Sequence, residues 1–157
     1  MSNIVIVGSG PAGVSAALYA VRAGVQTTVL TKGSGALARA EKIENYYGFA
    51  QPVSGPELER RSIENARRLG VQFVQTEAVG LTWTDRLTVE TLAGAYPADA
   101  VILATGASRA VPRIPGLPGL EGHGVSWCAA CDAFFYRGKD VAVLGSGEYA
   151  LHEVQAL

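Results

Sequence analysis

The chain has 157 residues, of which 48% are hydrophobic and 17% are charged, and its formal net charge is −1 at pH 7. Lysine and arginine are scattered among aspartate and glutamate, which argues against a nucleic-acid-binding stripe and against a polybasic membrane patch. No apolar run approaches the roughly 18 to 20 residues that span a bilayer, and no charged leader precedes the first strand-like segment. These features predict a cytoplasmic protein without a membrane anchor.

The first 30 residues predict a strand, a glycine turn, a helix and a second strand. Residues 3–7 are β-branched and apolar, residues 8–13 are Gly-Ser-Gly-Pro-Ala-Gly, residues 14–23 are rich in alanine, and residues 25–30 again favour a strand. Gly24 is expected to end the helix. This order is a βαβ unit of about 30 residues with a GxGxxG run at its turn.

The glycine run predicts a dinucleotide site, although glycine turns also serve structure alone. Gly8 permits the tight turn, Gly10 lets the backbone approach a pyrophosphate, and Gly13 lets helix and strand pack closely. The helix start supplies free N–H groups and the positive end of the helix dipole. The fingerprint also expects an acidic residue after the second strand, but Thr31 and Lys32 stand there. Either a hydroxyl or backbone contact takes over that role, or the ligand lies differently.

Two segments that follow leave alternatives open. Residues 33–40 form a loop of small residues that suits either a ligand or an exposed turn. Residues 43–49 place three aromatic rings around Asn45, which indicates either a core cluster or the wall of a planar ring system, with Asn45 as hydrogen-bond donor and acceptor.

The middle of the chain alternates helix and strand. Residues 56–69 have an apolar face and predict a helix whose charges are solvated. Residues 71–74 are a strand candidate, and residues 77–83 and 87–92 predict an antiparallel excursion around a turn. Residues 98–104 are apolar apart from Asp99 and predict a further continuous strand, which ends in Ala-Thr-Gly.

A second glycine fingerprint predicts a second nucleotide-binding unit. Residues 107–120 contain Pro112, Pro115 and Pro118 and lack a burial pattern, which is typical of a crossing between units. Residues 140–144 predict a strand, residues 145–150 are Gly-Ser-Gly-Glu-Tyr-Ala, and residues 151–157 predict a helix that is only begun.

The chain therefore predicts an α/β fold in three parts. Residues 1–110 are expected to form the N-terminal part of a Rossmann-like nucleotide-binding domain with an antiparallel β excursion. Residues 111–124 are the expected linker. Residues 125–157 are expected to begin a second Rossmann-like nucleotide-binding domain, which carries a pair of cysteines.

That pair, Cys128 and Cys131, comprises both cysteines of the sequence, and Asp132 follows directly. Two thiols separated by two small residues favour an exchangeable disulfide in a reducing compartment. The alternatives are a buried pair or half of a zinc site. His123 and His152 stand at no recognised ligand spacing, so no metal site is predicted within this chain.

The order of these motifs resembles the low-molecular-weight thioredoxin reductases, a family of FAD-dependent pyridine nucleotide-disulfide oxidoreductases. The resemblance rests on GSGPAG, IENYYG, ATGAS, CAACD with FFYRGK, and the strand that leads to GSGEYA, and it covers essentially the whole chain. It implies that residues 1–110 are the N-terminal part of an FAD-binding domain and that residues 125–157 begin an NAD(P)-binding domain with the redox CxxC. It also implies further C-terminal segments, and hence a truncated chain, and a homodimer.

The resemblance implies the following site residues. Cys131 would lie nearest the flavin, Cys128 would attack the partner disulfide, and Asp132 would be the acid/base. The cofactor-binding residues would be Gly8, Ser9, Gly10, Pro11, Ala12, Gly13, Thr31, Lys32, Gly33, Ser34, Gly35, Ala36, Asn45, Ala104, Thr105 and Gly106 for FAD, and Gly145, Ser146, Gly147 and Glu148 for the nicotinamide nucleotide.

The implied activity is transfer of electrons from NADPH or NADH through FAD to the cysteine pair, and then to the disulfide of a thioredoxin-like protein. Two other hypotheses stay open. One is a flavoprotein disulfide reductase with a different electron donor, and the other is an inactive FAD-binding fragment.

Overall fold

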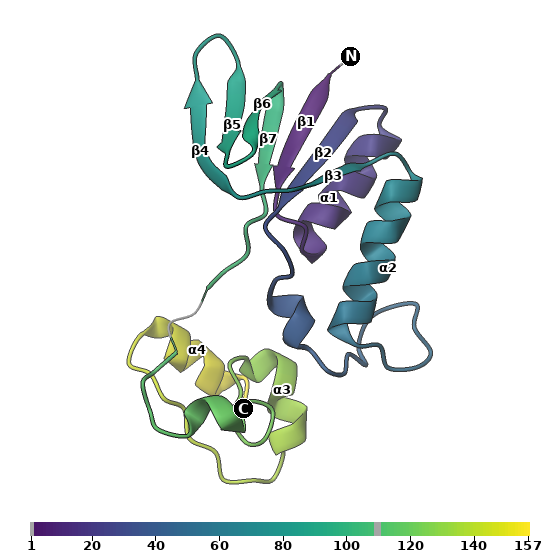
Figure 1. Ribbon diagram of the computed structural model, residues 1–157. Helices are drawn as coiled ribbons and strands as arrows, with labels where there is room; N and C mark the ends of the chain where they lie inside the picture. Colours follow the sequence, from purple (N-terminus) through teal and green to yellow (C-terminus); the bar gives the residue numbers. More distant parts are fainter. Residues whose placement is uncertain (1, 109–110) are drawn as a thin grey trace. The chain divides into compact units, whose positions relative to one another are not determined.

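A four-stranded parallel sheet is the centre of the first part of the computed structural model, which describes residues 2–108 and 111–157 (Figure 1). Its strands are β1 (Asn3–Val7), β2 (Gln26–Thr31), β3 (Gln72–Gln75) and β7 (Ala100–Leu103), in the order β3-β2-β1-β7. The predicted strands 3–7, 25–30 and 71–74 are confirmed within one or two residues. Because β1 lies between β2 and β7, both of its edges are hydrogen-bonded within the sheet.

Two helices cover one face of the parallel sheet (Figure 1). They are α1 (Pro11–Arg22) and α2 (Gly55–Arg68). Ile6 of β1 packs in one buried cluster with Val14 of α1 and Ala66 of α2. The helix predicted before Gly24 is confirmed, and Gly24 itself has a φ of +78°, a conformation that ends α1 and favours glycine.

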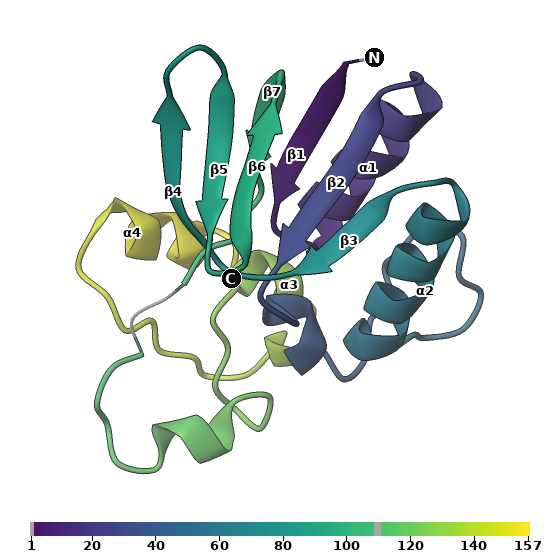
Figure 2. The same ribbon diagram turned by 45° about the horizontal axis from the view of Figure 1, so that its top comes forward.

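A three-stranded antiparallel sheet lies over the other face (Figure 2). Its strands are β4 (Ala78–Trp83), β5 (Leu87–Thr91) and β6 (Gly94–Ala98). Val5, the neighbour of Ile6 on β1, points to this side and packs with Val89 of β5. The unit therefore has three layers, and the predicted α/β fold with an antiparallel excursion is confirmed.

The predicted continuous strand 98–104 was wrong at its start. Ala98 ends β6 and Ala100 begins β7, so Asp99 separates two strands that belong to different sheets. Asp99 is held there by Asn3, whose backbone N–H donates to its carboxylate at 2.8 Å and whose backbone oxygen accepts the Asp99 N–H at 3.0 Å. Arg86 adds an ion pair to the same carboxylate at 3.2 Å.

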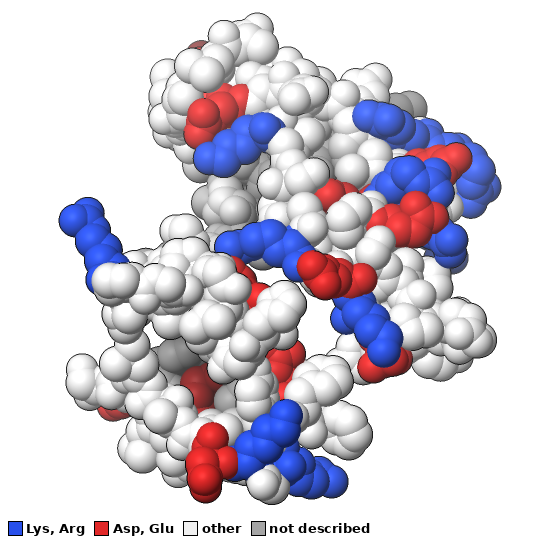
Figure 3. Space-filling view, turned by 60° about the horizontal axis from the view of Figure 1, so that its bottom comes forward, with Lys and Arg blue, Asp and Glu red and all other residues white. Residues whose placement is uncertain are grey.

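The charged face of α2 is solvated, as predicted. Arg60 and Arg61 both pair with Glu57, and Arg60 also pairs with Glu64. Positive and negative side chains are interspersed on the face that Figure 3 shows.

Within the described stretches, none of the helices has the length and apolar character that a membrane span requires.

The aromatic segment before α2 is not a core cluster. Tyr46 is 51% exposed and Tyr47 is 98% exposed, which rules out the core interpretation for these two rings. Phe49 is half-buried, with its ring centroid 5.8 Å from that of Tyr46. Residues 33–40, expected as a loop, contain the short 3₁₀ helix η1 (Ala36–Arg39).

The chain divides into two compact units, Met1–Ser108 and Arg109–Leu157. The end predicted for the first domain, residue 110, lies outside the described residues, and residues 111–124 group with the second unit. That unit contains the 3₁₀ helix η2 (Leu117–Leu120) and the helices α3 (Ala129–Tyr136) and α4 (Glu148–Gln155).

The strand predicted at residues 140–144 is absent: the structure shows no regular secondary structure there. A strand of a parallel sheet needs a neighbour for its backbone hydrogen bonds. The described residues of the second unit provide no such neighbour, whereas the helix predicted after the second glycine run does form, as α4.

Candidate functional site

The turn between β1 and α1 requires glycine at two positions. Gly8 has a φ of +112° and donates its N–H to the Leu30 oxygen at 2.8 Å. A Cβ at Gly8 would lie 2.1 Å from the oxygen of Ala104, and a Cβ at Gly13 would lie 1.9 Å from the oxygen of Gly8. The predicted tight turn at Gly8 and close packing at Gly13 are therefore confirmed.

Gly10 is different, because neither the turn nor the packing requires it. Its φ is −69°, which any residue adopts, and among the described residues a Cβ there would meet no atom within 4 Å. Gly10 is also the N-cap of α1, and no side chain in the described part of the chain caps this helix start. The open space beside uncapped N–H groups fits an anionic group such as a pyrophosphate.

The end of β2 is joined to the glycine turn through hydroxyl groups. The Ser9 and Thr31 hydroxyl oxygens lie 2.6 Å apart, and the Gly33 N–H donates to Thr31 Oγ1 at 3.2 Å. Lys32 points outward in an exposed ion pair with Glu77 at 3.1 Å. Of the two residues at the position where an acid is expected, Thr31 faces the glycine turn.

The structure thus brings together part of the predicted cofactor set. The turn at residues 8–13, residues 31–33 and Ala104 meet at the carboxyl ends of β1, β2 and β7, which is the place where such sheets bind ligands. Ser34, Gly35, Ala36, Thr105 and Gly106 follow as exposed residues. Asn45 is also exposed, and no described contact joins it to the glycine turn.

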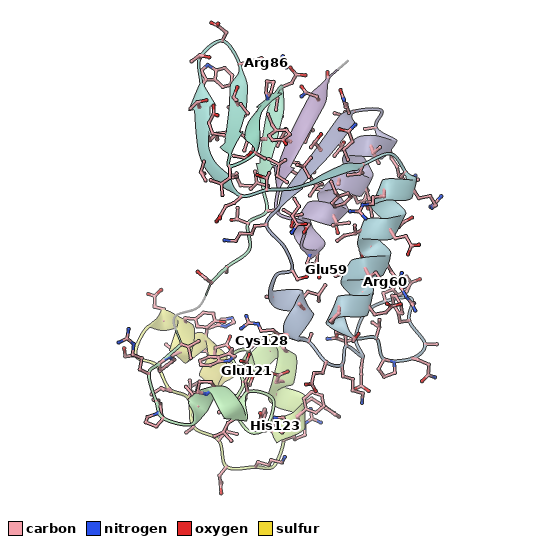
Figure 4. The ribbon with its side chains drawn as sticks, in the orientation of Figure 1. Glu59, Arg60, Arg86, Glu121, His123 and Cys128 are labelled. Carbon is pink, nitrogen blue, oxygen red and sulfur yellow. A yellow bond between two sulfur atoms is a disulfide. The ribbon has the colours of Figure 1, made fainter. Side chains whose placement is uncertain are left out.

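In the second unit, Cys128 and Cys131 form a disulfide, with their Cα atoms 5.3 Å apart (Figure 4). Cys128 is the N-cap of α3, and the N–H of Cys131 donates to its sulfur at 3.2 Å. Cys128 is half-buried and Cys131 is exposed. The sulfur of Cys128 therefore lies at the positive end of a helix, which is a position that stabilises a thiolate.

Ser126 links the cysteine pair to Asp132. Its hydroxyl donates to the Asp132 carboxylate at 2.5 Å and accepts the N–H of Cys128 at 3.1 Å. The N–H of Asp132 in turn donates to the oxygen of Cys128 at 3.1 Å. These bonds hold one carboxylate beside the disulfide in a fixed orientation.

A second carboxylate reaches the same helix start from α4. Glu153 accepts the backbone N–H of Ala129, the residue after Cys128, and its side chain is only 13% exposed. The sequence interpretation missed both Ser126 and Glu153. The signal available for Ser126 was a hydroxyl two residues before the motif, while Glu153 lies 24 residues away from its partner and gave no local signal.

The second glycine run starts α4. Gly147 is the N-cap, and a Cβ at Gly145 would lie 2.7 Å from the Cβ of Ala150, so Gly145 allows a close approach. Ser146 and Glu148 are exposed. Over residues 2–108 and 111–157, the structure shows no group of three or more His, Cys, Asp or Glu side chains that could hold a metal ion.

A parallel sheet of the dinucleotide-binding type, followed along the chain by a CxxC disulfide, is the combination typical of nucleotide-dependent disulfide oxidoreductases. Comparison with family models makes this specific: the model described as pyridine nucleotide-disulphide oxidoreductase matches residues 2–157. The chain belongs to this family.

The similar proteins include thioredoxin reductases. That of Streptomyces coelicolor is 38% identical over 160 residues, which cover 99% of this chain and 50% of that protein. The bifunctional thioredoxin reductase/thioredoxin of Mycobacterium leprae is 43% identical over 155 residues, which cover 96% of this chain and 34% of that protein. The crystal structure of thioredoxin reductase from Streptococcus pyogenes has a TM-score of 0.86 at 36% identity, over 98% of this chain and 51% of that one. The chain spans about half the length of the single-function relatives.

Proposed function

We propose that this chain carries the flavin-binding part and the redox centre of a thioredoxin-reductase-like enzyme, which uses NADPH or NADH to reduce the disulfide of a thioredoxin-like protein. The observation that carries the proposal is the Cys128–Cys131 disulfide at the start of α3, beside the fixed carboxylate of Asp132. The family membership and the similarity to thioredoxin reductases support it.

FAD is the cofactor proposed for the first unit. Its pyrophosphate would lie against Gly8 to Gly13, where Gly10 leaves open space and α1 starts without a side-chain cap. Thr31 to Ala36 would contact its adenosine side, with the Thr31 hydroxyl in place of an acid. Asn45 and residues 104–106 complete the proposed set. A flavin bound there would supply the chemistry of accepting a hydride and giving up two electrons as a pair.

The second glycine run, Gly145 to Glu148, is proposed to receive the nicotinamide nucleotide. Gly147 opens α4 without a side-chain cap in the described residues, so its first N–H groups are available to a phosphate. The choice between NADPH and NADH is left to titration, since the residues that would contact a 2′-phosphate are not among these four.

The cysteines and Asp132 account for the disulfide exchange. Reduction of the pair adds two electrons and two protons and yields two thiols. The Cys128 thiolate then attacks one sulfur of the partner disulfide, which forms a mixed disulfide and releases one partner thiolate. Cys131 next attacks Cys128 sulfur, which restores the Cys128–Cys131 disulfide and releases the second partner thiolate. Asp132 would accept the proton of the attacking thiol and return it to the leaving sulfur.

The proposed partner is a thioredoxin-like protein, and two exposed rings directly after the redox pair suit such a surface. Phe134 and Phe135 are 72% and 57% exposed on α3. One relative is a bifunctional thioredoxin reductase/thioredoxin, which is consistent with this partner.

We further propose that the protein is a homodimer and that it acts in the cytoplasm, where glutathione and thioredoxin systems keep thiols reduced. We propose no role for it in binding nucleic acid or membranes.

Trapping a mixed disulfide tests the assignment. A Cys131→Ser variant should accumulate a covalent adduct with a thioredoxin-like substrate through Cys128, visible on a non-reducing gel, while a Cys128→Ser variant should not. Full disulfide reduction by Cys131→Ser would contradict the proposal.

The absorbance spectrum of the purified protein distinguishes the two alternative functions. A yellow protein that NADPH and NADH do not reduce but another donor does indicates a different electron donor. A colourless protein indicates an inactive fragment.

A further inference from the structure

The carboxylate of Glu153 and the sulfur of Cys128 share the start of α3. Glu153 accepts the N–H of Ala129, the first residue of the helix, and Cys128 sulfur accepts the N–H of Cys131, two residues later. The first four N–H groups of a helix carry its partial positive charge, because they have no partner within the helix. One carboxylate of low exposure and one redox sulfur therefore use the same limited source of positive potential.

We propose that Glu153 is a positioning residue that sets the redox equilibrium of the Cys128–Cys131 pair toward the disulfide, which makes the reduced pair a stronger reductant. This inference rests on the proposed function, since it concerns the same pair of cysteines. It adds a residue outside the CxxCD motif that controls how readily the pair gives up its electrons.

The direction follows from charge. Reduction of the disulfide by two electrons and two protons gives two thiols, and ionisation of Cys128 then leaves a thiolate at the helix start. A thiolate there is stabilised by the positive end of the helix, as in strongly oxidising pairs, whose reduced form is stabilised. Glu153 already neutralises part of that potential and repels a second anion. The reduced form is thereby destabilised relative to the disulfide, which suits a protein that must reduce another disulfide.

Other charged groups near the pair are accounted for by their own contacts. Asp132 lies in the first turn of α3, and its carboxylate accepts a hydrogen bond from the Ser126 hydroxyl. The second oxygen of Glu153 lies 3.8 Å from Nδ1 of His152. The carboxylate of Glu153 is distinguished by its low exposure and by its bond to the first N–H of α3.

The test is the thiol-disulfide equilibrium of the full-length protein in buffers of reduced and oxidised dithiothreitol at pH 8, read by quenching and labelling free thiols with a maleimide mass tag. Glu153→Gln keeps an oxygen that can accept the Ala129 N–H but removes the charge. We expect it to shift the equilibrium about three- to tenfold toward the dithiol. Glu153→Ala should shift it in the same direction.

Asp140→Asn is the matched control, since Asp140 is an exposed acid of the same unit, outside α3 and α4. An equilibrium within twofold of the parent in Glu153→Gln, or an equal shift in Asp140→Asn, would overturn the proposal. The labelling reads thiols directly and needs neither flavin, nicotinamide nor a protein partner. Failure of the proposed enzyme activity would therefore leave this measurement interpretable.

Discussion

The hydroxyl oxygens of Ser9 and Thr31 lie 2.6 Å apart and join the glycine turn after β1 to the last residue of β2. Ser9 is only 6% exposed, so its hydroxyl depends on this bond. Dinucleotide-binding sheets of this kind commonly place an acidic residue at the end of the second strand, to bind a ribose. Here a neutral pair of hydroxyls occupies that region, and the proposed cofactor contact is a hydroxyl rather than a carboxylate.

A double-mutant cycle measures this link. Thr31→Val leaves the Ser9 hydroxyl buried without its partner, which should cost about 1 to 3 kcal/mol of the free energy of unfolding. Ser9→Ala in the Thr31→Val background should add little, because the group that needed a partner is then gone. Urea denaturation of the two single variants and the double variant gives the coupling. Additive losses in the double variant would show that the two hydroxyls do not interact.

The three glycines of the first fingerprint should separate folding from cofactor binding. Gly10→Ala places a methyl group in open space at a φ of −69°, so the fold should be retained. The same methyl group would fill the proposed pyrophosphate position, so the flavin absorbance of the purified protein should be lost. Gly13→Ala should lose both, because its Cβ would lie 1.9 Å from the Gly8 oxygen.

Circular dichroism of the two variants reports whether each is folded, and the visible spectrum reports whether each retains flavin. A folded Gly10→Ala protein that retains bound flavin would contradict the proposed position of the pyrophosphate. A stable, flavin-bound Gly13→Ala protein would contradict the close packing of α1 on the turn.

Local pattern was sufficient for the first βαβ unit, since apolar runs and glycines alone define β1, α1 and β2. It failed at β6, which contains Pro97 and two alanines. Proline suits an edge strand, where an N–H can be dispensed with, and β6 is at the edge of its sheet. It also failed at residues 140–144, where the composition favours a strand but the described second unit offers no neighbour for pairing.

In the candidate site, too, local sequence patterns were predictable and contacts between distant residues were not. Cysteine spacing and the glycine runs are local, so the CxxCD motif and the turn at Gly8 were predictable. The contact of Glu153 with Ala129 and that of Thr31 with Ser9 join residues far apart in the sequence, and they depend on how the helices and strands pack. Ser54, which caps α2 by accepting the Glu57 N–H, was available as a Ser-x-x-Glu signal and was missed.

Ser126 should support the proposed acid/base role of Asp132. Asp132→Asn should lower the rate at which the reduced pair exchanges with a protein disulfide by about 100-fold, because the proton acceptor is lost. Ser126→Ala should give a smaller loss, since the carboxylate remains but loses the hydroxyl that orients it at 2.5 Å. Ser126→Thr retains a hydroxyl and should recover most of the rate. Stopped-flow measurements across a pH series compare these variants with the parent protein. Exchange rates equal to the parent's in all three variants would exclude both residues from the exchange.

The acid stability of the protein should depend on Glu57. The side chains of Arg60 and then Arg61 donate hydrogen bonds to its carboxylate and lower its pKa from 4.5 to about 2. A carboxyl group whose pKa is lower in the folded than in the unfolded protein contributes stability above its unfolded pKa, and that contribution is lost as the pH falls toward the folded value. The contribution of Glu57 is therefore complete above about pH 4.5 and disappears between there and about pH 2.

Glu57→Gln should flatten the curve of unfolding free energy against pH in this window and leave its slope near neutral pH unchanged. Glu59→Gln is the matched control on the same helix, because the ion pairs found on α2 among the described residues do not include Glu59. Urea denaturation from pH 2 to pH 7 gives both curves, and a Glu57→Gln curve parallel to that of the parent throughout would show that the Arg60 and Arg61 contacts do not persist in solution.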